Sequence, residues 1–100
     1  MMTGAANATT VTNVELTLGQ MRIEQEWTTQ VIAVKNNDGY PISTLWVECG
    51  FYQNGQLVGA NQSYANNVAP GTTAFLEVTK HITADKAQCR VSEVRRPLTR

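Results

Sequence analysis

The sequence has little of what several functional classes require. Its 8 basic and 8 acidic residues leave no net charge, so it lacks the basic stripe that binds a phosphate backbone. Nucleic acid is therefore not an expected partner. No apolar run approaches the roughly 18 residues that a membrane-spanning helix needs. Apolar residues also do not recur at helical spacing, which argues against a helical fold.

Catalytic and metal-binding patterns are missing as well. His81 is the single histidine, and neither C-x-x-C nor H-x-x-x-H spacing is present, so we expect a surface histidine and no metal site. A Cys–His pair, a glycine-rich phosphate loop and a G-x-S-x-G elbow are not predicted either. Glu24 and Glu26 would share a strand face about 6.6 Å apart, but their polar neighbours indicate a solvated strand. We expect no enzyme active site and no cofactor.

The sequence is instead rich in short runs of Val, Ile, Thr and aromatic residues, separated by turn residues. The clearest run is 43–52, whose period-two alternation predicts a strand with two distinct faces. The expected inner face carries Leu45, Val47, Cys49 and Phe51, and the outer face carries Trp46, Glu48, Gly50 and Tyr52. Asn54-Gly55 follows, and this pair predicts a type I′ hairpin turn.

Further strands are expected on both sides of that hairpin. Their ranges are 11–18, closed by Gly19; 21–36, divided near Glu26-Trp27; 57–64; 73–79; and 87–94. About seven short strands predict an all-β antiparallel sandwich of the immunoglobulin-like kind. We expect a disordered leader over 1–10, one domain over 11–96 and a tail over 97–100. Trp27 is expected to plug the core, and residues 83–87 are the best candidate for one helical turn.

Three segments resemble a known family. Residues 31–42 (VIAVKNNDGYPI), 51–59 (FYQNGQLVG) and 68–74 (VAPGTTA) are similar to turn and core stretches of FxLYD-type domains. The resemblance implies an immunoglobulin-like β-sandwich of bacterial envelope or secreted proteins. Gln53 departs from it, since the family often has Asp there, and the two cysteines are not part of the pattern. The matching residues are structural, so they transfer no active site.

Cys49 and Cys89 lie on the expected inner faces of their strands. One interpretation is a disulfide that joins the two strands, which requires Cα atoms within about 7 Å of each other. Closing a loop of about 40 residues would stabilise the fold by roughly 4 kcal/mol in the chain-entropy model. The other interpretation is two buried free thiols, since cysteine packs as a small hydrophobic residue.

The aromatic residues of the outer face are the candidate binding residues. Trp46 and Tyr52 could form an exposed patch, with Tyr64 nearby on the return strand, or Trp46 could be covered by a neighbouring segment. A non-catalytic interaction module is the main hypothesis, binding a protein partner or a second copy through a sheet edge or this patch. The alternative is a module that binds a carbohydrate or another small ligand through Trp46, Tyr52 and Tyr64.

The expected location is periplasmic or secreted. Ala6-Asn7-Ala8 fits the small-x-small pattern that precedes signal cleavage, although a flexible leader would look the same. The last eleven residues contain a cluster of four arginines, which are Arg90, Arg95, Arg96 and Arg100. On a terminal strand, such a cluster is typical of a solvated edge.

Overall fold

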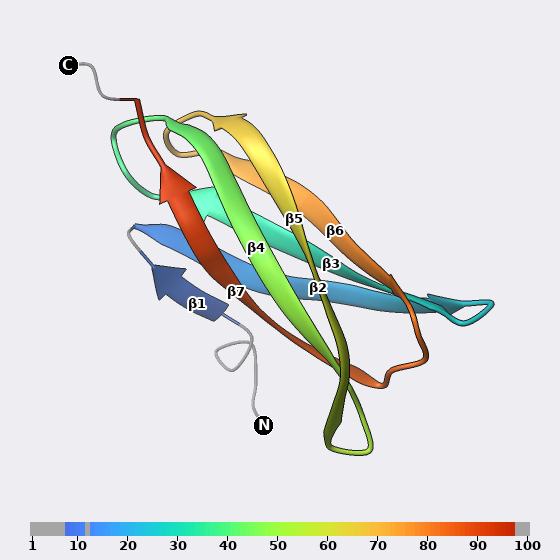
Figure 1. Ribbon diagram of the computed structural model, residues 1–100. Coiled ribbons are helices and arrows are strands. Elements are labelled where there is room, and N and C mark those ends of the chain that lie inside the picture. The colour runs from blue at the N-terminus through green and yellow to red at the C-terminus, as the bar shows by residue number, and fades with distance from the viewer. Residues whose placement is uncertain (1–7, 12, 98–100) are drawn as a thin grey trace.

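The computed structural model describes residues 8–11 and 13–97 of the chain, which form two packed β-sheets (Figure 1). The strands are β1 (Ala8–Val11), β2 (Val14–Glu24), β3 (Trp27–Asn36), β4 (Ile42–Gln53), β5 (Gln56–Val68), β6 (Thr73–His81) and β7 (Lys86–Arg95). One sheet has the order β2-β3-β6, with the short β1 added beside β2, and the other has the order β5-β4-β7. Every pairing is antiparallel, so the expected all-β sandwich is confirmed.

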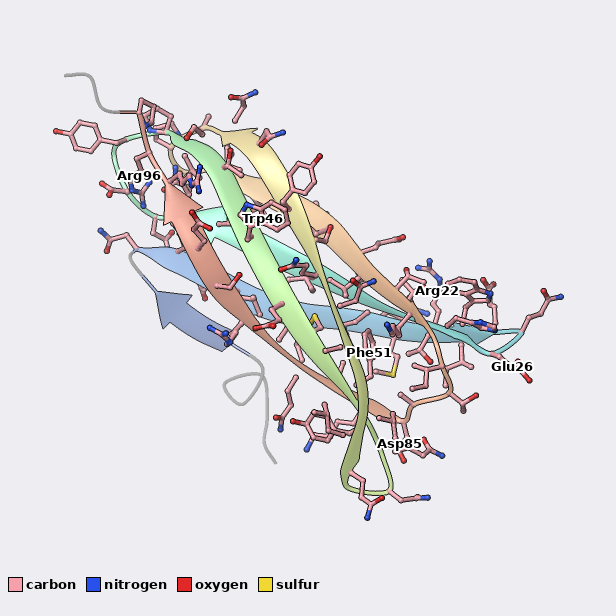
Figure 2. The ribbon with its side chains drawn as sticks, viewed as in Figure 1. Arg22, Glu26, Trp46, Phe51, Asp85 and Arg96 are labelled. Atoms are coloured by element: carbon pink, nitrogen blue, oxygen red, sulfur yellow. A yellow bond between two sulfur atoms is a disulfide. The ribbon has the colours of Figure 1, made fainter. Side chains whose placement is uncertain are left out.

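The core lies between the two sheets and follows the period-two pattern. Leu45, Val47, Cys49 and Phe51 have no exposed surface, which confirms the inner face expected for β4. Ile32 and Val34 of β3 are buried from the opposite sheet, and Phe51 points into the interior in Figure 2. Since each of these side chains removes its apolar surface from water, the alternation itself drives the two sheets together.

The β4–β5 hairpin turns as the sequence predicts. Asn54 and Gly55 both have positive φ, 53° and 82°, which is the requirement of a type I′ turn. β5 continues to Val68, four residues past the expected end of the return strand. The loop 69–72 then carries the chain to β6 in the other sheet.

Gly19 does not end its strand, contrary to expectation. β2 runs through it to Glu24, and its register against β3 shifts between Leu18 and Met21. The amide of Gln30, which is buried on β3, donates from Nε2 to the carbonyl of Gly19 over 3.0 Å. The glycine therefore marks a bulge whose backbone is satisfied by a side chain, rather than a strand end.

The turn between β2 and β3 corrects two further expectations. Gln25 and Glu26 have positive φ, so Glu24 and Glu26 do not follow one another along one strand face. Trp27 is 48% exposed and stacks on His81, with ring centroids 4.6 Å apart; the expectation of a core plug is wrong. His81 is exposed, as expected, and its Nε2 lies 3.6 Å from the Glu26 carboxylate.

The ends of the domain and the β6–β7 connection differ in detail from expectation. β1 includes residues 8–10, which the sequence assigns to the leader; residues 1–7 and 98–100 lie outside the described part of the chain. The connection over residues 82–85 is irregular rather than helical. Among the described residues, no helix is long and apolar enough to cross a membrane.

Candidate functional site

The strand β5 forms one edge of the β5-β4-β7 sheet and is the most exposed of the strands β2 to β7. It pairs with β4 along its length and, in the described part of the chain, with no other strand. Ala60, Gln62, Tyr64 and Asn66 are all exposed. An edge strand of this length presents a row of backbone groups to which another strand can pair.

The register identifies which backbone groups of β5 are free. Cys49 on β4 lies directly opposite Cys89 on β7, with Cα atoms 4.0 Å apart, and such a short distance marks a non-hydrogen-bonded pair. The N–H and C=O of Cys49 therefore point to the other side, toward its β5 partner Asn61. Because this direction alternates along a strand, Ala60, Gln62, Tyr64 and Asn66 direct their N–H and C=O groups away from β4.

The β5 edge carries no charge. Residues 49–76 contain no Asp, Glu, Lys or Arg, and the 13 residues of β5 fall within this stretch. Natural proteins usually protect exposed edges with charges, proline, bulges or short strands. Of these, β5 has only a bulge near its start, where its register against β4 shifts between Phe51 and Tyr52. Its exposed side chains are polar amides, small residues, Tyr64 at 54% exposure and, next to the hairpin turn, Leu57 and Val58. No charged side chain on this edge would therefore repel a second strand.

Contacts with the other sheet limit this edge at its N-terminal end. β6 runs beside β5 (Figure 1), and Asn61 Nδ2 donates to the carbonyl of Thr79 over 2.7 Å. Gly59 lies against the side chains of Ile82 and Lys80. These contacts are made by the face of β5 that carries Gly59 and Asn61, whereas the alternate residues Ala60, Gln62, Tyr64 and Asn66 are exposed.

The disulfide between Cys49 and Cys89 is formed, and the described residues contain no free cysteine. The bridge joins two directly paired residues of β4 and β7, so the prediction that it connects the middle strand to the last strand is confirmed. A disulfide of this kind fits an oxidising environment. It fixes β7, and not β5, to the centre of the sheet.

The three candidate aromatic residues do not form a single patch. Trp46 and Tyr64 are directly paired across β4 and β5, with ring centroids 4.9 Å apart and planes tilted by 34°. Trp46 is only partly exposed and lies on the outer face of its sheet (Figure 2). Tyr52 lies six residues further along β4, beyond Glu48 and Gly50. Since their planes are tilted, the paired rings are not one flat platform.

A shallow depression lies between those two positions on the outer face. It has a volume of about 400 Å³ and exists because Gly50 and Ala60 are small. Tyr52, Leu57, Glu48 and Arg90 also line it. The Arg90 Nη2 donates to Glu48 Oε1 over 2.7 Å, so these two lining charges neutralise each other.

The described residues contain no group of three or more His, Cys, Asp or Glu side chains placed to hold a metal ion. A sheet edge and the outer aromatic residues are both expected binding surfaces from the sequence, but the expectation does not identify β5 as that edge. The signal for that edge was available, because the uncharged stretch over 49–76 can be read directly from the sequence.

Comparison with protein-family models, curated proteins and solved structures gives no match for this chain. The site is therefore defined by its own geometry: an uncharged edge strand, a tilted aromatic pair beside it and a shallow depression on the adjoining face.

Proposed function

We propose that this domain is a non-catalytic interaction module that binds an extended segment of a protein partner along the β5 edge. The observation that carries the proposal is a 13-residue edge strand without a single charged residue. In strand addition, backbone hydrogen bonds supply affinity and alternate side chains supply specificity. Ala60, Gln62, Tyr64 and Asn66 offer both the free backbone groups and the exposed side chains for this mode.

We also propose that the fold is immunoglobulin-like and related to FxLYD-type domains. Support comes from the strand order: β2-β3-β6 corresponds to strands A-B-E of an immunoglobulin sandwich, and β5-β4-β7 corresponds to C′-C-F. The disulfide favours an extracytoplasmic location, either periplasmic or secreted. Both proposals agree with an interaction module, since such sandwiches commonly present their edges and loops to partners.

A displayed library of random extended peptides tests the binding mode. We expect the selected peptides to slow amide hydrogen exchange at Gln62 and Tyr64 and to bind Gln62→Lys at least about tenfold more weakly. The matched control is Gln88→Lys, which adds the same charge to the outer face of the opposite edge strand, β7. Peptides that bind both variants and the wild-type chain equally would contradict the proposal.

A second candidate function rests on the depression beside Tyr52. Its volume of about 400 Å³ lies within the usual range for small-ligand sites. It combines an aromatic and an aliphatic side chain with the neutral Glu48–Arg90 pair, which suits an uncharged saccharide. Titration of tryptophan and tyrosine fluorescence against a panel of oligosaccharides tests it, with Tyr52→Ala as the variant that abolishes binding. A flat response to the whole panel excludes this function.

A further inference from the structure

We infer that the occupant of the β5 edge is a second copy of this chain, paired antiparallel about a two-fold axis at Gln62. This inference rests on the proposed function, because it names the partner of the same edge. The two sheets β5-β4-β7 would then join across the axis into one continuous sheet. Such an isologous contact uses the same surface on both copies, which is the commonest symmetry of soluble dimers.

The backbone direction of β5 fits this axis. A two-fold axis through a hydrogen-bonded pair requires one residue to face itself and exchange both N–H···O=C bonds. Gln62 meets this condition, because its N–H and C=O point away from β4. The same register sets Ala60 of one copy opposite Tyr64 of the other, and both of these residues also have free backbone groups.

The side chains fit the same register. Residues directly opposite each other in an antiparallel pair lie on one face of the sheet. At the axis, the two Gln62 side chains can donate and accept an amide hydrogen bond with each other. On either side of the axis, Ala60 of one copy lies opposite Tyr64 of the other. Because the alanine side chain is only a methyl group, the exposed tyrosine ring can pack over it without a clash.

The charge distribution permits two copies to approach at this edge. Like charges placed directly opposite each other destabilise a strand pair, and a two-fold axis always brings like residues together. β5 carries no charge at any position. The other edge of the same sheet, β7, carries Lys86, Arg90, Glu93 and Arg95, so the equivalent contact through β7 would require burying several charged groups.

Sedimentation velocity of the whole chain, from about 1 µM to about 1 mM, tests the inference over the range expected for a small interface. We expect a concentration-dependent monomer–dimer equilibrium in the wild-type chain. Gln62→Lys brings two positive charges together at the axis and should weaken the dimer at least about thirtyfold. Gln88→Lys adds the same charge to β7 and should leave the dissociation constant within about twofold.

Amide hydrogen exchange of the same samples tests the register. The amides of Ala60, Gln62 and Tyr64 should become protected as the protein concentration rises, whereas that of Ser63, which bonds to β4, should be protected throughout. A wild-type chain that stays monomeric at the highest concentration would overturn the inference, and so would a dimer that Gln62→Lys leaves intact.

The two proposals fail in distinguishable ways. If the chain stays monomeric but selected peptides still bind the β5 edge and lose affinity in Gln62→Lys, the second copy is excluded and the interaction module stands. If peptides and dimerisation are both indifferent to Gln62→Lys, neither proposal survives.

Discussion

The two edges of the β5-β4-β7 sheet are built in opposite ways. β7 is tied to β4 by the Cys49–Cys89 disulfide and carries charges of both signs. β5 is held by backbone pairing with β4, has no disulfide and carries no charge. Each strand has one register shift against β4, so the two edges differ in their charges, which are a device that keeps an edge from pairing. Within one sheet, therefore, one edge is closed to other strands and the other is left open.

The arginines of β7 form ion pairs with neighbouring carboxylates. Arg90 pairs with Glu48, and Arg95 pairs with Glu93. These groups are largely exposed, and exposed ion pairs contribute little to stability. Their larger effect is to make strand pairing at this edge costly, since each charge would lose water on association. The expectation of a solvated edge agrees with the exposed Arg90 and Arg95 but not with Arg96, whose side chain is 20% exposed and lies against Asp38 and the Tyr40 carbonyl.

Removing the disulfide should have the largest effect on stability, and it should affect β7 more than β5. Cys49→Ala combined with Cys89→Ala opens a loop of sequence separation 40, and we expect a loss of about 4 kcal/mol in the free energy of unfolding. Chemical denaturation of oxidised wild type and the double variant measures it. Hydrogen exchange should rise more along β7 than along β5. Equal loosening of both strands would show that the bridge does not distinguish the two edges.

Proline substitution sharpens the assignment of the open side of β5. Ser63 directs its N–H to β4, so Ser63→Pro removes a ladder hydrogen bond and should cost about 2–3 kcal/mol of unfolding free energy. Gln62 directs its N–H outward, so Gln62→Pro should cost less than about 1 kcal/mol. Thermal and urea denaturation of the pair checks this. The reverse ranking would mean that the alternation along β5 is assigned one residue out of phase.

Asn36 on β3 links the C-terminal end of β5 to the opposite sheet. Its Nδ2 donates to the carbonyls of Val68, at the end of β5, and Tyr40, and its side chain is fully buried. Asn36→Ala removes the donor to the Val68 carbonyl, whereas the Tyr40 carbonyl keeps its bond from Arg96, and we expect a loss of about 2 kcal/mol. Amide exchange should increase near Val68 while β7 is unchanged. Unaltered exchange at Val68 would mean that β4 alone fixes the end of β5.

Neutralising a charge on β7 should have the smallest effect on stability. Arg90→Gln breaks a largely exposed pair with Glu48, so the free energy of unfolding should change by less than about 0.5 kcal/mol. Denaturation at low and high salt provides the measurement, with Lys86→Gln as the control. A loss well above 1 kcal/mol would show that the charges of β7 hold the fold rather than protect the edge.

Local chemistry predicted much of this domain. The alternation in 43–52 identified the interior of β4, and Asn54-Gly55 identified the hairpin, because both depend on near neighbours in the chain. The cysteines were placed on facing strands, but the sequence left both a bridge and two thiols open. Their direct pairing depends on the register between β4 and β7, which are separated by two other strands.

The expectations that were wrong share a physical cause. Gly19 was expected to end a strand, but a bulge capped by Gln30 carries the strand through it. Trp27 was expected in the core, but the strand turns at the margin of the sheet and leaves the ring exposed against His81. In both cases, a residue eleven or more positions away decides the outcome, and no local propensity encodes that distance.

The sequence by itself determined that the chain forms strands with one apolar face, where its tightest turn lies, and that residues 49–76 carry no charge. Only the tertiary structure decided that β5, which lies within this uncharged segment, is one edge of its sheet, and that the charged last strand, β7, is the other edge. Side-chain alternation is a property of each strand alone, whereas the position of a strand within a sheet depends on which distant segments pair with it.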